Sequence, residues 1–183
     1  MKSRVILDSK EFDLTLRRLC FQLIENHNDF SSTVIIGIQP RGVYLSDRLV
    51  QLLKSIKPNI AIKYGKLDIT FYRDDFRRSE KLAEPSKTEI DFTIEGKNVV
   101  LVDDVLYTGR TIRASLDSLL DYGRPENVEL LTLIDRRLKR HLPIQPNYVG
   151  KVIDSIEAEK VKVDWKEIEG KDSVWIVEKN QQV

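Results

Sequence analysis

The sequence predicts an α/β fold in which a parallel sheet is flanked by helices and carries a small β flap or hood. Three short apolar runs, at residues 33–38, 98–102 and 128–134, have the composition of strands buried on both faces. Helical patterns separate these runs, and alternation of strands with helices is typical of a parallel sheet. The 183 residues and 41% hydrophobic content suit a single domain spanning residues 1–183.

The first half of the chain predicts two helices, one strand and a less regular region. Apolar side chains recur at helical spacing over residues 10–27, and Ser9 is the expected N-cap. The strand at 33–38 breaks at residues 39–42, and a second helix follows that ends before Pro58. Residues 60–72 alternate in polarity, which predicts an extended segment or a hairpin. Residues 73–90 are charged and poor in apolar anchors, which is typical of a mobile lid or a binding loop.

The second half begins with the strand at 98–102, a polar turn and a helix over about residues 111–122. Gly123 is the expected stop of this helix. The apolar strand at 128–134 then ends at Asp135. Short β-rich runs at 148–152, 161–165 and 173–177 predict the added flap.

Composition excludes several classes of protein. The 30 basic residues nearly balance the 29 acidic ones, so a polyanion partner would need a local patch. Cys20 is the one cysteine, which excludes an internal disulfide and favours a buried thiol. His27 and His141 are isolated in the sequence and lack a third ligand, so we expect neither a zinc site nor a catalytic triad. No apolar run approaches a membrane helix or a signal-peptide core, so we expect a soluble, cytoplasmic protein without a membrane partner.

The richest chemistry follows the strand at 98–102. Asp103 and Asp104 are predicted where that strand ends, and residues 107–111 form a turn ahead of a helix. Ligands of parallel sheets bind at this edge, and the amides of such a turn can bind an anion. Gly109 lets the backbone approach closely, while the carboxylates suit sugar hydroxyls or Mg²⁺. These features together predict a site for a sugar phosphate, although the short Thr-Gly-Arg-Thr sequence alone favours an ordinary capped helix.

The complete thirteen-residue string at 99–111 resembles the phosphoribosyl pyrophosphate (PRPP) signature of type I phosphoribosyltransferases. Residues 37–45 resemble that family's pyrophosphate-binding loop. Residues 68–75 look like the root of the flexible loop of its PyrR-type members, which are pyrimidine regulatory proteins. The likeness covers most of residues 4–178 and implies a type I phosphoribosyltransferase-like fold.

The resemblance implies a uracil phosphoribosyltransferase that converts PRPP and uracil into UMP and pyrophosphate with Mg²⁺. Asp103 and Asp104 would hold the ribose hydroxyls and, with PRPP, Mg²⁺; no separate metal site is implied. Arg41 would grip pyrophosphate and Arg73 would close over the site; these two and the aspartates are the implied catalytic residues. The remaining implied substrate-binding residues are Pro40, Gly42, Tyr107, Thr108, Gly109, Arg110, Thr111, Asp135 and Arg136.

The base is indicated by one position. Hypoxanthine-guanine enzymes carry an aspartate where Tyr107 stands, and a tyrosine with an ordinary pKa of about 10 cannot replace a carboxylate base. This favours a pyrimidine, and a structural role for Tyr107 stays open. Two departures from the family are a longer segment at 135–141 and Pro40 in place of a threonine. The family's cis peptide would fall at Pro40–Arg41, with Gln39–Pro40 as the alternative.

Partners beyond the substrates follow from the same resemblance. An mRNA leader could bind a basic patch of Arg17, Arg18, Lys139 and Arg140, or these residues could form a solvated face. Phe21 and Asn26 stand where basic or RNA-contacting residues are expected. A homo-oligomer, dimer or larger, is implied. Two alternative functions remain: a purine salvage transferase, and a mainly RNA-binding regulator that senses UMP.

Overall fold

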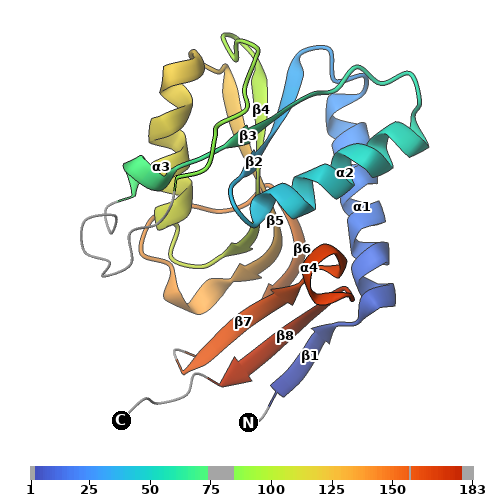
Figure 1. The fold of residues 1–183 in the computed structure, drawn as a ribbon, viewed down its shortest axis with the longest axis vertical. Coiled ribbons are helices and arrows are strands. Elements are labelled where there is room, and N and C mark those ends of the chain that lie inside the picture. Colours follow the sequence, from blue (N-terminus) through green and yellow to red (C-terminus); the bar gives the residue numbers. More distant parts are fainter. Residues whose placement is uncertain (1–2, 74–84, 157, 179–183) are drawn as a thin grey trace.

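A five-stranded sheet forms the centre of the computed structural model, which describes residues 3–73, 85–156 and 158–178. Every neighbouring pair of strands is parallel, and the order is β3-β2-β4-β5-β6 (Figure 1). The strands are β2 (Thr33–Ile38), β3 (Lys63–Leu67), β4 (Asn98–Leu106), β5 (Asn127–Arg136) and β6 (Tyr148–Ile153). The predicted α/β fold with a parallel sheet is confirmed.

Helices cover both faces of this sheet (Figure 1). The helices α1 (Ser9–His27) and α2 (Gly42–Ile56) pack on one face, and α3 (Arg110–Leu119) packs on the other. Their apolar sides form two cores, one on each side of the sheet. The short elements are η1 (Thr70–Tyr72), η2 (Leu120–Tyr122), η3 (Arg137–Lys139) and α4 (Lys166–Glu169).

The flap is a three-stranded antiparallel sheet in the order β1-β8-β7. Its strands are β1 (Ser3–Leu7), β7 (Glu159–Asp164) and β8 (Ser173–Glu178), and it lies beyond the carboxyl ends of the parallel strands (Figure 1). The sequence prediction was right for β7 and β8 and wrong for the third strand. The run at 148–152 forms β6 of the main sheet, because it pairs in parallel with β5. The missing flap strand is β1, in which only Ile6 and Leu7 are buried.

Two local predictions are corrected. The N-cap of α1 is Asp8, not Ser9: the Asp8 carboxylate accepts from the Glu11 amide at 2.8 Å, and the Glu11 carboxylate accepts from the Asp8 amide at 3.0 Å. This reciprocal pair is a capping box. Of the two alternatives for residues 60–72, the extended segment is confirmed by β3 and the hairpin is wrong, because β3 runs parallel to β2 and is followed by η1.

The charged loop predicted at 73–90 falls largely on residues 74–84, which lie outside the described part of the chain. In the described remainder, Glu89 forms an isolated antiparallel bridge with Lys66 of β3. The backbone amides of both residues donate to each other's carbonyl groups, at 3.0 and 2.8 Å. The end of this segment is therefore attached to the sheet edge.

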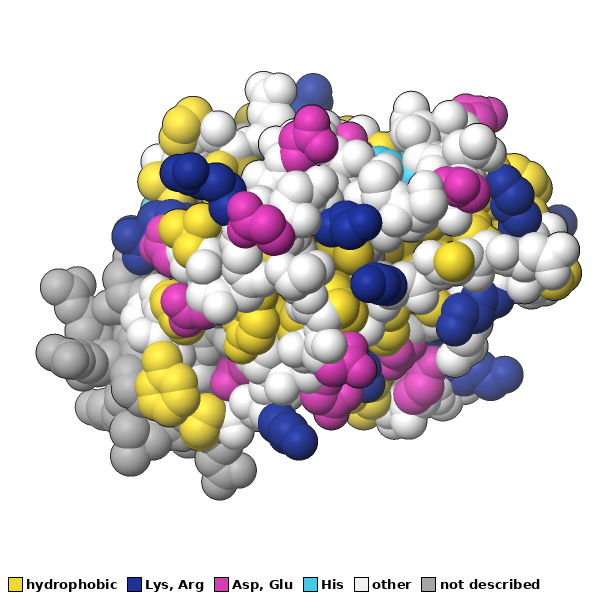
Figure 2. Space-filling model, turned by 90° about the horizontal axis from the view of Figure 1, so that it is seen from above, with side chains coloured by type: hydrophobic (Ala, Val, Ile, Leu, Met, Phe, Trp, Pro, Cys, Tyr) yellow, Lys and Arg dark blue, Asp and Glu magenta, His cyan; other side chains and the backbone are white. Residues whose placement is uncertain are grey.

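Cys20 is buried in the core between the sheet and helices α1 and α2, as predicted. Burial raises the pKa of its thiol to about 12, which suppresses the reactive thiolate. Among the helices of the described residues, none has both the length and the apolar character needed to cross a membrane. Figure 2 views the molecule from the amino-end side of the parallel strands, where basic and acidic side chains are interspersed.

Candidate active site at the carboxyl edge of the sheet

Strands β4 and β5 extend past β2 at the carboxyl edge of the sheet. Pairing of β2 with β4 ends at Gly37 and Val102, whereas β4 stays paired with β5 as far as Leu106. Asp103 and Asp104 therefore lie inside β4, not after its end as predicted. They follow immediately after the last residue paired with β2, so they occupy the step where one neighbouring strand stops.

The two carboxylates of this step are buried, with 8% and 7% of the residues exposed. Burial, and then the adjacent charge of Asp104, raises the pKa of Asp103 well above its usual value, against a lowering by Arg73. Burial also raises the pKa of Asp104, and the hydrogen bond from Arg41 opposes this rise. Two buried carboxylates whose pKa values remain raised beside Arg41 and Arg73 are suited to binding further positive charge or hydroxyl donors.

Arg41 approaches the carboxylates from the start of α2. Its Nε donates to Asp104 Oδ2 at 3.1 Å, and its guanidinium also donates to the carbonyl of Val163 in β7. The cis bond predicted at Pro40–Arg41 is wrong, and the alternative is confirmed: the cis peptide bond is Gln39–Pro40. The contact with Asp104 places Arg41 at the site.

Gly42 lies where α2 begins, directly against β4. A Cβ atom at this position would be 2.5 Å from the Val102 carbonyl oxygen and 3.1 Å from the Asp103 Cα. Both are backbone atoms of a central strand, which has little freedom to move. The absence of a side chain at Gly42 is thus what lets α2, with Arg41, approach the carboxylates.

Residues 107–109 connect β4 to α3, and together with the first two residues of the helix they form residues 107–111, here called the phosphate loop. Gly109 caps α3 in a left-handed conformation, with φ at 91°. A cavity of about 480 Å³ is lined by this loop together with Arg73, Asp103 and His141. The structure thus brings together the predicted anion-binding turn, one predicted carboxylate and the predicted lid arginine.

A second cavity, of about 410 Å³, lies on the flap side of the carboxylates. Arg41 and Asp104 line it together with residues 160–163 of β7. Lys160 and Lys162 were not predicted as site residues. Their signal in the sequence is the alternation of lysine and valine at 160–163, which places both lysines on one side of a strand.

Arg136 is the last residue of β5, and its side chain is committed to the flap and to Tyr107. Its Nε donates to Ser155 Oγ at 2.8 Å, and its Nη2 donates to the Glu159 carbonyl at 3.0 Å. Its guanidinium lies 3.9 Å from the centre of the Tyr107 ring, within the range of a cation–π contact. Tyr107 therefore has a structural role, the possibility that its place in the sequence left open, because its ring packs against Arg136.

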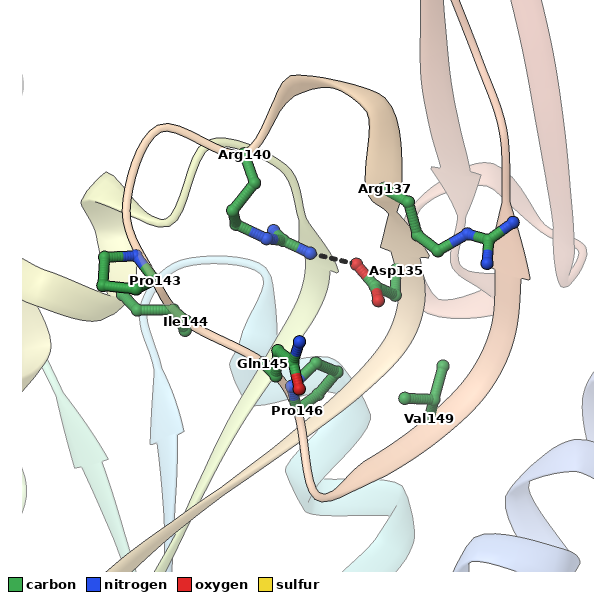
Figure 3. A pocket seen from close by; sticks show the side chains of 8 residues that line it. All are labelled: Asp135, Arg137, Arg140, Pro143, Ile144, Gln145, Pro146 and Val149. Atoms are coloured by element: carbon green, nitrogen blue, oxygen red, sulfur yellow. Dashed lines mark hydrogen bonds and ion pairs between the residues drawn. The ribbon is translucent and has the colours of Figure 1, made fainter.

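Asp135 precedes Arg136 and lies on a third cavity, of about 600 Å³, enclosed by the loop between β5 and β6 (Figure 3). Its carboxylate forms an ion pair with Arg140, drawn as the dashed line in Figure 3. Arg137 in the same figure turns away from Asp135 and instead pairs with Asp154 at 2.8 Å.

The four residues of the predicted basic patch do not all present their charge to solvent. Arg18 donates to the carbonyls of Val149 and Gly150, at 2.9 and 2.6 Å. Arg17 pairs with Asp13 at 2.9 Å on the exposed side of α1. Arg140 is turned toward Asp135, so two of the four side chains hold the fold together.

The carboxylate pair fits a magnesium ion that is bound with its substrate. Among the described residues, no group of three or more histidine, cysteine, aspartate or glutamate side chains could hold a metal by itself. Mg²⁺ commonly takes one or two carboxylates and completes its coordination with phosphate oxygens and water. Asp103 and Asp104 supply that small number of oxygen donors beside both cavities.

The family model and the sequence relatives that match this chain point to the same family. Residues 4–168 match the model of the family described as "Phosphoribosyl transferase domain". A protein of Picosynechococcus sp. named "Bifunctional protein PyrR" is 44% identical over 172 residues, covering 94% of this chain and 96% of that protein. A protein of the same name from Halalkalibacterium halodurans is 41% identical over 179 residues, covering 97% of this chain and 98% of that protein.

Solved structures agree on the fold. A hypoxanthine phosphoribosyltransferase from Staphylococcus aureus superposes with a TM-score of 0.70 at 21% identity, covering 98% of this chain and 94% of that chain. The hypoxanthine phosphoribosyltransferase of Trypanosoma cruzi has a TM-score of 0.70 at 14% identity, covering 96% of each chain. At these identities the likeness concerns the fold and not the base that is used.

Proposed function

Because the chain belongs to the phosphoribosyl transferase family, and within it to the PyrR proteins, we propose that it is a uracil phosphoribosyltransferase. The reaction joins uracil to the ribose 5-phosphate unit of PRPP, giving UMP and pyrophosphate. The observation that carries this proposal is the buried pair Asp103 and Asp104 between two cavities, one lined by the phosphate loop and one by Arg41.

In the proposed reaction, the bond between ribose C1′ and the pyrophosphate oxygen breaks with both electrons leaving on oxygen. A uracil nitrogen forms the new bond to C1′, and its proton passes to the departing pyrophosphate or to water. Asp103 and Asp104 accept hydrogen bonds from the 2′- and 3′-hydroxyls, and their negative charge stabilises the cationic ribose that develops. Because the site is buried, this charge acts in a low-dielectric surrounding.

The phosphate groups are assigned to the two cavities. The 5′-phosphate lies against the phosphate loop, where backbone amides at the start of α3 and the hydroxyls of Thr108 and Thr111 can donate to it. Pyrophosphate lies on the side of Arg41, whose planar fork suits phosphate oxygens. Arg73 covers the first cavity and excludes water. Mg²⁺, when bound, neutralises phosphate charge, and the residues that would hold it are Asp103 and Asp104.

Uracil is placed beside Asp135 and the flap. Tyr107 occupies the position of the purine enzymes' aspartate, and Arg136 fixes its ring. A phenol held in this way offers no carboxylate to a purine. The homo-oligomeric state and the single-domain organisation are part of the same proposal, and the latter is supported by a core that includes residues of both the parallel sheet and the flap.

We predict that the protein converts labelled PRPP with uracil, whereas turnover with hypoxanthine or guanine stays at the background rate. The reason is the loss of the carboxylate base at Tyr107. Orotate is included as a second pyrimidine control. Release of labelled pyrophosphate is measured for each base at saturating concentration. Faster turnover with hypoxanthine would support purine salvage instead. A protein that binds UMP but converts none of the four bases would be a sensor of UMP.

A second, regulatory function is favoured by the resemblance to PyrR-type regulators and by relatives named as bifunctional proteins. We predict that a leader transcript of the pyrimidine genes binds more tightly when UMP is present. The Arg17→Ala variant should bind it more weakly, since Arg17 is exposed on α1. Filter binding at fixed salt measures both effects, with Lys54→Ala on the exposed side of α2 as control. Equal affinity with and without UMP would contradict the regulatory function.

A further inference from the structure

We propose that Arg140 is a positioning residue that holds the phosphate loop in place from the loop between β5 and β6. That second loop, residues 137–147, is called the crossing loop below. The inference rests on the proposed function, because it concerns how the same site grips the 5′-phosphate of PRPP. It assigns to Arg140 a role different from the RNA contact predicted for it.

The guanidinium of Arg140 joins the two loops directly. Its Nη1 donates to the Tyr107 carbonyl at 2.6 Å, and its Nη2 pairs with the Asp135 carboxylate. The side chains of Arg140 and Asp135 are only 18% and 10% exposed. A charge-assisted bond to a backbone carbonyl in so sheltered a place restrains the loop more than an exposed ion pair would.

The crossing loop lies alongside the phosphate loop and contacts successive residues of it. Arg140 contacts Tyr107, and the His141 amide donates to the Thr108 carbonyl at 3.0 Å. At Gly109, a Cβ would meet Ile144 at 3.2 Å and Leu142 at 3.4 Å. The first three residues of the phosphate loop are thus supported by a neighbour that is distant in sequence.

Tyr107 is held from two sides by two arginines. Arg136 lies over its ring, at 3.9 Å from the ring centre, while Arg140 binds its backbone carbonyl. Tyr107 is the first residue of the phosphate loop, so its position sets the direction of the amides that follow. A shift there of about 1 Å is enough to cost roughly 10²-fold in rate at a site that depends on geometry.

An arginine is required for this double contact. Its rigid fork can serve the Tyr107 carbonyl and the Asp135 carboxylate together, whereas a lysine offers one mobile ammonium group. Removing the guanidinium would also leave the Asp135 charge buried without its partner. Arg137 is the matched control: it makes a bidentate pair with Asp154 from the same loop, but these side chains are 60% and 51% exposed.

The test compares Arg140→Lys with Arg137→Lys in the full chain. Affinities for ribose 5-phosphate and for pyrophosphate are measured separately by calorimetry, together with KM for PRPP, kcat and the melting temperature. For Arg140→Lys we expect ribose 5-phosphate affinity to fall and KM for PRPP to rise by about 10-fold or more. Pyrophosphate affinity should change less than about 2-fold, because Arg41 lies in the other cavity. Arg137→Lys should match the unaltered protein.

Three outcomes, the third of them from filter binding of RNA to the same two variants, would overturn the proposal. Equal ribose 5-phosphate affinities for the two variants would show that Arg140 does not position the loop. A parallel loss of both ligands with a lower melting temperature would show general structural support only. Weaker RNA binding with unchanged ribose 5-phosphate affinity would restore Arg140 to the RNA patch. If the unaltered protein converts no base, the proposed function fails, while the two titrations still report on Arg140.

Discussion

The variants Asp103→Asn and Asp104→Asn are each expected to lose turnover by roughly 10²–10³-fold, the range for removing one preorganised electrostatic partner of a transition state. An asparagine keeps the shape of the side chain but removes the charge that stabilises the cationic ribose. Steady-state kinetics with uracil and PRPP measure the loss. A normal kcat in both variants would remove the ribose-holding role from this pair.

The same variants should melt at higher temperature without ligand. The pKa of each carboxyl is raised in the folded protein, so the folded state binds protons more readily than the unfolded chain. Stability is then lost as pH rises from the unfolded pKa of about 3.9 toward the folded value. An asparagine cannot ionise and avoids this loss at pH 7. About 1 kcal/mol corresponds to roughly 2–4 °C for a chain of this size, and we expect at least that rise.

Asp117→Asn on α3 is the control for this gain in stability, because Asp117 is an exposed carboxylate. Its removal should leave both the melting temperature and turnover nearly unchanged. The difference in melting temperature between each aspartate variant and the unaltered protein should also shrink below about pH 4, because the pair is then protonated in both the folded and the unfolded state. A melting temperature that falls for Asp103→Asn at pH 7 would contradict the assignment of a buried, unfavourable charge.

Gly42→Ala is expected to reduce both stability and turnover. Its Cβ would lie 2.5 Å from the Val102 carbonyl oxygen, so α2 has to move away from β4. Overpacking of this kind costs about 1–3 kcal/mol. Because Arg41 precedes Gly42 and donates to Asp104, the same movement should lower kcat/KM by about 10²-fold. Denaturant unfolding and kinetics on one preparation measure the two effects.

Val50→Ala separates displacement from simple loss of stability. Val50 is a buried residue of the same helix, and shortening it removes core contacts without inserting an atom against β4. It should destabilise the protein by a similar amount and leave kcat/KM within about 3-fold. Equal kinetic losses in the two variants would mean that the gap between α2 and β4 has no specific part in holding Arg41.

Local sequence patterns were enough to predict a ligand site at Asp103, Asp104 and the phosphate loop. Asp103, Asp104 and the phosphate loop all fall within residues 103–111, and their spacing relative to a buried strand is visible without the fold. Arg41 was predicted only through the resemblance of residues 37–45 to the pyrophosphate-binding loop, since an arginine after a proline turn is by itself an ordinary surface residue. The predicted end of β4 was early because Asp103 and Asp104 are polar, although β4 remains paired with β5 to Leu106.

The features that were missed depend on contacts between distant residues. β1 has two buried residues and becomes a strand by pairing with β8. The contact of Arg136 with the Tyr107 ring and the bond of Arg140 to the Tyr107 carbonyl join segments that no periodicity relates. The N-cap at Asp8 was missed for a different reason: both Asp8 and Ser9 are good caps, and Glu11 at the third helical position decides between them.

The pairing of β1 with β8 has a consequence for the order in which the two sheets form during synthesis. Ser3–Leu7 is synthesised before all strands of the parallel sheet and Ser173–Glu178 after them, so the early strand waits for its partner. The parallel sheet can form before that, because domains acquire structure as they emerge. The flap, and with β7 the Val163 carbonyl that accepts from Arg41, is added last. A nascent chain would therefore hold the carboxylates and the phosphate loop before the flap side of the site exists.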